Sequence, residues 1–144
     1  MSVASRLLHI VGARPNFMKA APVVAASRAL GSQPILVHTG QHYDRQLSEV
    51  FFDQLGLPEP DLNLGVGSGS HAVQTAALLT ALEATMLDIA PDAGVVYGDI
   101  NSTMAAALVA SKLLKPLVHV EAGLRRLDRP MPEEVNRVVT DALA

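Results

Sequence analysis

Short apolar segments alternate with longer helical patterns along nearly the whole of this chain. The apolar segments have the length of strands, and they are apolar at consecutive positions: residues 7–11, 34–39, 94–97 and 117–120, with a shorter candidate at 62–64. Helical patterns fill the intervals: residues 17–30, 45–55, 71–89, 102–114 and 132–144. Alternating strands and helices predict right-handed βαβ units and a parallel sheet. Continuously apolar strands are typical of a sheet covered on both faces, so we expect an α/β fold with a doubly wound parallel sheet.

The composition narrows the class of protein further. The chain has 144 residues, about one domain, and its 49% hydrophobic and 17% charged residues exclude a disordered chain. A net charge of −3 gives no basic surface for nucleic acid, and no run reaches the roughly 18 apolar residues of a membrane span. The lack of cysteine excludes disulfides, thiol nucleophiles and zinc–cysteine sites. Because residues 7–11 are too short for a signal-peptide core, we expect a cytoplasmic protein.

Polar and ionisable residues follow four of the predicted strands at the point where each strand ends. These segments are residues 12–16, 39–44, 98–103 and 121–125. The carboxyl ends of parallel strands meet at one edge of the sheet, and doubly wound sheets bind ligands in the crevice there. Charge is also concentrated late in the chain, since residues 121–144 hold nine charged side chains and residues 101–120 hold two. This distribution predicts a polar cleft edge beside an apolar body.

Arg14 and Lys19 follow the first predicted strand, in a turn that enters a helix. A helix start offers N–H groups and positive potential, and an arginine fork adds bidentate binding of phosphate. The spacing is equally compatible with two ordinary solvated charges. Gly12 has no partner glycines at the offsets of a dinucleotide fingerprint, and the turn is not a Walker loop.

Asp99 and Glu121 are the carboxylates that directly follow the predicted sheet strands. Asp99 would be either a turn or capping residue or a functional group, and Ser102 could cap the next helix in its place. Glu121 would lie at the ligand edge or pair with Arg125 or Arg126, because a buried carboxylate needs such a partner.

Glu133 and Glu134 begin the last predicted helix, where acidic side chains favour the positive helix end. Arg137 lies four residues after Glu133, which is the spacing of an ordinary helical ion pair. His9 and His119 fall inside strands, so we expect core positions for both. The histidines show no metal-ligand spacing, and we expect no metal.

Five ordered blocks of sequence resemble the non-hydrolysing UDP-N-acetylglucosamine 2-epimerases. They are residues 12–19 (GARPNFMK), 38–44 (HTGQHYD), 97–99 (YGD), 119–125 (HVEAGLR) and 131–137 (MPEEVNR). The resemblance covers nearly the whole chain, and the last two blocks are the most specific. Ala13 and Asn16 depart from the commonest family pattern without removing a reacting group.

The resemblance implies a two-domain GT-B fold that holds a UDP-sugar between two Rossmann-like halves. Residues 1–144 resemble the N-terminal half, and the second domain, which supplies most uridine and diphosphate contacts, is absent from this chain. We therefore expect a fragment, a split gene or a truncated product, and little activity from the chain alone. The resemblance also implies a homodimer in the full-length form.

The family activity implied is interconversion of UDP-N-acetylglucosamine and UDP-N-acetylmannosamine, without nicotinamide or any other cofactor. UDP is eliminated across C1–C2 to leave 2-acetamidoglucal, and it then adds back after a proton returns to the other face of C2. By motif position, the resemblance implies three catalytic carboxylates and three substrate-binding cations: Asp99, Glu121 and Glu133, with Arg14, Lys19 and Arg137. It also places Gln41 and His42 in a block linked to a second, activating UDP-sugar site.

Three alternatives compete with this interpretation. A GT-B glycosyltransferase would share the fold and the nucleotide, although the blocks around Glu121 and Glu133 argue against it. A short-chain nicotinamide epimerase needs Tyr-x-x-x-Lys, and neither Tyr43 nor Tyr97 has a lysine four positions later. A non-catalytic remnant would fold without a partner for its cleft.

Overall fold

The computed structural model describes residues 4–41, 53–54, 56 and 59–144 of the chain. Its five strands form one parallel sheet in the order β3-β2-β1-β4-β5. The strands are β1 Arg6–Val11, β2 Gln33–His38, β3 Leu62–Asn63, β4 Ala93–Tyr97 and β5 Leu117–Val120. The helices are α1 Arg14–Ala29, α3 His71–Ile89, α4 Asn101–Lys112 and α5 Pro132–Leu143. The strand order is that of a Rossmann-type sheet, which confirms the predicted fold class.

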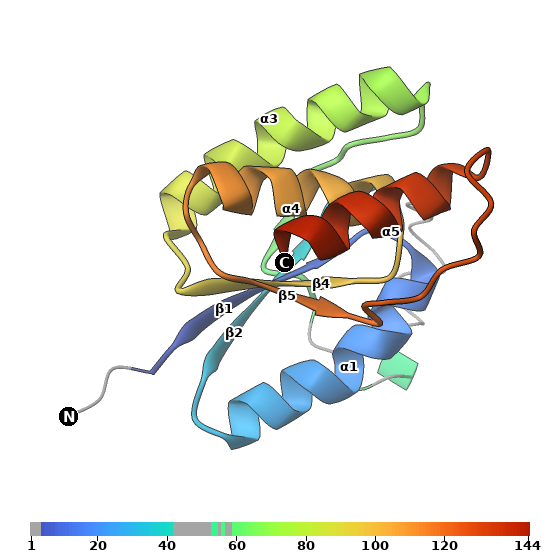
Figure 1. Cartoon of the computed structure of the whole chain (residues 1–144). Coiled ribbons are helices and arrows are strands. Elements are labelled where there is room, and N and C mark those ends of the chain that lie inside the picture. The colour runs from blue at the N-terminus through green and yellow to red at the C-terminus, as the bar shows by residue number, and fades with distance from the viewer. Residues whose placement is uncertain (1–3, 42–52, 55, 57–58) are drawn as a thin grey trace.

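Helices cover both faces of the sheet (Figure 1). Helix α1 lies on one face, where Phe17 and Val24 pack with Val11 and Leu36. Helices α3, α4 and α5 lie on the other face in Figure 1. There Leu8 and Ile10 of β1 belong to a core cluster with residues of α3 and α4. Successive strand residues point to opposite faces, so continuously apolar strands supply two cores.

Most predicted elements are confirmed, with differences of one residue at strand ends and of one to three residues at helix ends. The predicted strand 117–120 and helix 71–89 have the observed bounds. Helix α1 begins at Arg14 rather than residue 17, because Pro15 stands in the first turn, where its missing N–H costs nothing. The predicted helix 45–55 lies outside the described residues except for Asp53 and Gln54, which are helical.

Helix α3 is the one helix in the described part of the chain that is long and apolar enough to cross a membrane. This is weak evidence for a span, because core helices pass the same test of length and composition. Leu78, Leu82 and Met86 of α3 are buried in the core over the sheet. One side of α3 is therefore packed on the core, and 28% of its apolar stretch is buried.

Helix α5 packs against α4 and β5 and presents buried polar side chains to them. Glu134, Asn136 and Thr140 are all buried, while Val135 between them is 40% exposed. A helix buries an apolar face by default, so a buried polar face needs partners in the structure. Glu134 and Asn136 find partners in the loops that follow β5 and β4, whereas the hydroxyl of Thr140 donates to the Asn136 carbonyl within α5.

Candidate active site

Asp99 and Glu121 lie at the same edge of the sheet, just beyond the ends of adjacent strands. The parallel register pairs Tyr97 at the end of β4 with Val120 at the end of β5. The N–H of Gly98 also donates to the carbonyl oxygen of Val120 at 3.3 Å. The two strands thus deliver both carboxylates to the crevice position of a doubly wound sheet.

Asp99 is held by two residues of α5. Nη2 of Arg137 donates to Oδ2 of Asp99 at 2.6 Å, and Nδ2 of Asn136 donates to the Asp99 carbonyl at 2.9 Å. The expected helical pair between Arg137 and Glu133 is wrong, because the guanidinium reaches across to the loop after β4. Only 14% of the Arg137 side chain is exposed, so the short distance joins two largely desolvated charges.

Glu121 forms an ion pair with Lys19 of α1. Of the two alternatives for Glu121, the position at the carboxyl edge of the sheet agrees with the structure, whereas Arg125 pairs with Asp141 instead. A Cβ at Gly98 would lie 3.7 Å from Nζ of Lys19, an ordinary contact, but 3.2 Å from Nδ2 of Asn16, which is tight. Gly98 also has a φ of +71°, which glycine adopts without strain. Glycine at position 98 thus suits both the backbone conformation of this loop and the close approach of Asn16.

Asn16 occupies backbone donors at the turn into α1. Its Oδ1 accepts from the N–H groups of Gly12 at 3.1 Å and Ala13 at 3.2 Å, and its Nδ2 donates to the Tyr97 carbonyl at 3.2 Å. Two backbone N–H groups at the start of this helix are therefore already hydrogen-bonded to Asn16 and are not free to bind a phosphate. Arg14 lies exposed in the first turn of α1, where its side chain is accessible to a ligand.

A cavity of about 250 Å³ adjoins this cluster and brings Gln41 and Glu133 into one lining. Asn101 and Asn136 line it too, and Nδ2 of Asn136 donates to Oδ1 of Asn101 at 3.2 Å. His42, the neighbour of Gln41, lies outside the described residues. The lining is rich in amide side chains, which donate and accept hydrogen bonds as sugar hydroxyls require.

Ser102 does not cap α4. The helix follows Ile100 without a side-chain cap, and Ser102 is buried. Oε1 of Gln41 accepts from both the N–H of Ser102 at 2.9 Å and its Oγ at 2.6 Å. Oγ of Ser102 also lies 2.8 Å from Oγ1 of Thr39. A Cβ at Gly12 would meet Thr39 Oγ1 at 2.4 Å, so glycine is required for this close packing.

Glu134 is buried and binds the arginine-rich loop before α5. Its Oε2 accepts from the N–H of Arg126 at 2.5 Å. Burial alone would raise the pKa of Glu134, but hydrogen bonds from the backbone of residues 126–128 and the charge of Arg137 lower it below its ordinary value. Glu134 is therefore ionised and holds this loop in place. The sequence had predicted only that an acidic residue favours the first turn of the helix.

His9 and His119 are core residues, as predicted. His9 is fully buried beneath α1, and its Nδ1 lies 2.7 Å from the hydroxyl of Tyr97. Burial lowers the pKa of His9 and of His38 to about 4 and raises that of Tyr97. All three groups are thus neutral at pH 7 and add no charge to the site.

Sequence reasoning missed the residues that hold the site together. Asn136, Glu134 and Asp141 bind the loops after β4 and β5, and none was a candidate. Positions 134, 137 and 141 share one helix face, at spacings of three and four. A polar stripe at that spacing, on a helix that must pack against the sheet, was the signal that could have found Glu134 and Asp141.

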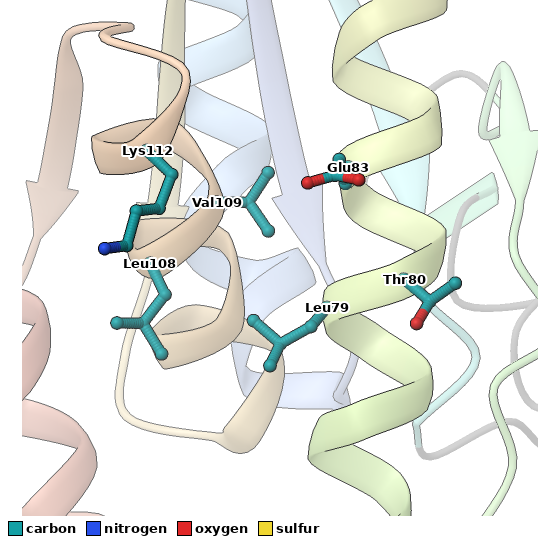
Figure 2. Close-up of a pocket in the computed structure, with 6 residues that line it drawn as sticks. All are labelled: Leu79, Thr80, Glu83, Leu108, Val109 and Lys112. Carbon is teal, nitrogen blue, oxygen red and sulfur yellow. The ribbon is translucent and has the colours of Figure 1, made fainter.

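Two further features lie apart from this cluster. Among the residues that the structure covers, no group of three or more His, Asp or Glu side chains could hold a metal ion. A shallow groove of about 390 Å³ runs between α3 and α4, and Figure 2 shows its six lining side chains. They are Leu79, Thr80, Glu83, Leu108, Val109 and Lys112. The groove lies toward the far end of α4 from Asn101 and Ser102.

The fold and the cluster define a Rossmann-like domain with a charged crevice at the carboxyl edge of its sheet. A family model described as UDP-N-acetylglucosamine 2-epimerase matches residues 25–144, and the chain belongs to this family. A UDP-N-acetylglucosamine 2-epimerase homolog of Methanococcus maripaludis is 51% identical over 96% of this chain and 39% of its own length. The UDP-2,3-diacetamido-2,3-dideoxy-D-glucuronate 2-epimerase of Pseudomonas aeruginosa is 48% identical over 96% and 40%.

Solved structures agree with this assignment. The crystal structure of the Methanocaldococcus jannaschii UDP-GlcNAc 2-epimerase in complex with UDP-GlcNAc and UDP superposes with a TM-score of 0.93 and 45% identity. The match covers 96% of this chain and 38% of that one. The match to these relatives confirms the GT-B epimerase fold class. The chain spans about two fifths of the length of the relatives that it matches.

Proposed function

We propose that residues 1–144 act as the N-terminal Rossmann-like domain of a two-domain UDP-sugar 2-epimerase. The whole protein would interconvert UDP-N-acetylglucosamine and UDP-N-acetylmannosamine. The observation that carries this proposal is the convergence of two ion pairs, Asp99–Arg137 and Lys19–Glu121, at one edge of the sheet. Family membership and the UDP-sugar complexes of relatives support the substrate class.

The proposed chemistry needs both the carboxylates and the cations of this cluster. The C1–O bond breaks and its electron pair leaves with UDP, while a base removes the proton from C2 to leave 2-acetamidoglucal. UDP adds back to C1 after a proton reaches the opposite face of C2. Asp99, Glu121 and Glu133 are the candidates for proton transfer and for stabilising positive charge at C1. Arg14, Lys19 and Arg137 would hold the diphosphate close enough to return.

Arg137 has a free donor for this purpose. Its Nη2 is bound to Asp99, while its Nη1 is buried and has no hydrogen-bond partner among the described residues. A buried guanidinium nitrogen without a partner is costly, so a ligand oxygen at that position would be stabilising. This supports Arg137 as a substrate-binding residue rather than a purely structural one.

The position of Gln41 in the lining of the cavity supports a second part of the proposal. A second, activating UDP-N-acetylglucosamine would bind beside the first, with Gln41 and His42 as its contacts. Substitution of Gln41 by Ala should leave turnover measurable but abolish any rise in rate with UDP-N-acetylglucosamine concentration beyond simple saturation. A rate curve identical to that of the parent would contradict this assignment.

Isotope exchange tests the proposed reaction. The segment is joined in frame to the part of the Methanocaldococcus jannaschii relative that the match leaves uncovered, and the product is incubated with UDP-N-acetylglucosamine in deuterium oxide. An epimerase places deuterium at C2, which proton NMR detects, whereas a glycosyltransferase does not. Absence of exchange above an enzyme-free control would contradict the proposal.

The Pseudomonas aeruginosa relative directs attention to a second substrate. Its name specifies a 2,3-diacetamido glucuronate attached to UDP, and it is 48% identical to this chain. The same exchange experiment with that sugar distinguishes the two candidates by their kcat/KM. A homodimer is also part of the proposal, and sedimentation equilibrium of the joined protein should give twice the protomer mass.

A further inference from the structure

His119 of β5 links the loop after β4 to helix α5. Its ring is buried, with 1% of the side chain exposed. Nε2 lies 2.7 Å from the carbonyl oxygen of Gly98, and Nδ1 lies 2.5 Å from Oδ1 of Asp141. Gly98 directly precedes Asp99. One imidazole therefore joins the backbone beside a candidate carboxylate to a side chain of α5.

Asp141 extends this link into the loop after β5. Its Oδ2 accepts from the N–H of Gly123 at 2.9 Å and from Nη1 of Arg125 at 2.7 Å. Glu121 lies between His119 and Gly123, and both of these residues bind the same carboxylate. The loop is thus fixed on either side of Glu121.

The backbone of Glu121 needs such bracing. Its φ is +70°, in the left-handed region that residues other than glycine rarely adopt. A residue persists there only where surrounding contacts hold it, and such positions cluster at functional sites. The ion pair with Lys19 involves a side chain that is 40% exposed, so it is a weak restraint. The bonds to Asp141 are better shielded, because its side chain is 14% exposed.

The hydrogen-bond partners of His119 define its charge. Burial raises the pKa of Asp141, but hydrogen bonds from Arg125, Gly123 and His119 lower it below its ordinary value, so this carboxylate is ionised. An ionised carboxylate and a backbone carbonyl can only accept hydrogen bonds, whereas a neutral imidazole has one N–H. Both bonds to His119 form together only when both ring nitrogens carry a proton.

We propose that His119, as an imidazolium, and Asp141 are positioning residues that fix the loops of Asp99 and Glu121 relative to each other. The catalytic consequence of this pair rests on the proposed epimerase function. The physical link itself does not, because it is defined by contacts within this chain. The pair would act on the reaction through the two carboxylates and would touch no substrate.

The first test measures the His119 ring in the unmodified 144-residue chain. Nitrogen-15 NMR at pH 7 should show both ring nitrogens of His119 protonated. In Asp141→Asn one of them should become unprotonated, and the amide signals of Gly98 and Glu121 should shift. One unprotonated ring nitrogen in the unmodified chain would overturn the proposal, and this result needs no variant to fold.

The second test measures kinetics in the joined two-domain protein. Asp141→Asn should lower kcat by about ten- to a hundredfold while KM changes by less than about threefold, because ground-state binding is retained and transition-state alignment is lost. Asp141→Glu keeps the carboxylate and should recover part of the rate. The matched control is Asp92→Asn, since Oδ2 of Asp92 also accepts a backbone N–H, from Arg6 at 2.7 Å, but at the opposite edge of the sheet.

The outcomes separate this proposal from the proposed function. A kcat for Asp141→Asn equal to that of the Asp92→Asn control would overturn the positioning role. Failure of the unsubstituted joined protein to exchange deuterium would contradict the epimerase function. In that case the ring measurement still decides whether His119 and Asp141 form the charged link.

Discussion

Arg137 and Asp99 form a hydrogen-bonded ion pair of 2.6 Å across 38 positions of sequence. The pair connects α5 to the loop after β4, a strand that lies between β1 and β5 in the sheet. It places the positive charge of α5 against a candidate catalytic carboxylate. The two terminal nitrogens of the arginine fork have different roles at this position. Nη2 binds Asp99, and Nη1 has no hydrogen-bond partner among the described residues.

Arg137→Gln should therefore impair catalysis in the joined protein. It removes the restraint on Asp99 and the unpaired donor together, and we expect the rate of epimerisation to fall by about 10²-fold, the scale of losing a charged hydrogen bond in a desolvated site. Arg137→Lys should recover only part of the rate, because an ammonium cannot replace the fork. Steady-state kinetics of both variants give the answer, and a Gln variant as fast as the parent would refute the role.

The Lys19–Glu121 pair should matter far more for activity than for stability. Both side chains are partly exposed, at 31% and 40%, so solvent screens the pair. Lys19→Met should change the free energy of unfolding by less than about 1 kcal/mol. Urea denaturation measures this, with Lys112→Met on α4 as a matched lysine outside the site. A stability loss several times that of the control would show that the ion pair is structural.

Glu134 should stabilise the fold in a pH-dependent way. Its pKa is lowered in the folded state, so its contribution is present above the unfolded pKa and is lost as the pH falls through the folded value. Glu134→Gln should be less stable than the parent at pH 7, and the difference should shrink in acid, where the parent is protonated too. Urea unfolding at both pH values, with amide exchange of residues 126–128, tests this. A constant difference would contradict the role of the ionised carboxylate.

His9 and His38 should make the fold sensitive to mild acid. Burial lowers both pKa values from 6.5 to about 4, so between these values the unfolded chain binds more protons and stability falls as the pH falls. As the pH falls from 6.5 to about 4, each histidine should lower the free energy of unfolding by about 3 kcal/mol. His9→Gln can still bond to the Tyr97 hydroxyl but does not titrate, and it should reduce the pH dependence. A profile unchanged from the parent would count against neutral, buried His9.

The 144-residue chain alone should show little or no epimerisation. The relatives are about two and a half times longer than the region that matches. In the proposed two-domain enzyme, these residues supply only the side of the crevice that belongs to the N-terminal domain. Turnover by the purified chain, measured with the joined protein as positive control, would show that one domain suffices. The same assay addresses the alternative of a non-catalytic remnant, because a remnant would stay inactive even when joined.

Sequence predicted the sheet and its edge because both follow from local rules. Continuous apolar runs gave the strands, and Asp99 and Glu121 follow adjacent parallel strands, so they had to reach the same edge. Partners of the charged residues were not predictable in this way. Arg137 pairs with Asp99 rather than Glu133, and Glu121 pairs with Lys19, so both pairs depend on tertiary packing between residues far apart in the sequence.

Deuterium entry at C2 in carboxylate variants is the most direct test that Asp99 and Glu121 act on one sugar ring. In the joined protein, Asp99→Asn and Glu121→Gln should each slow exchange at C2 of UDP-N-acetylglucosamine by about 10²- to 10⁴-fold, the usual contribution of a positioned acid or base. Both variants should still bind UDP, as isothermal titration calorimetry would show. Exchange by both variants at close to the parent rate would contradict the account.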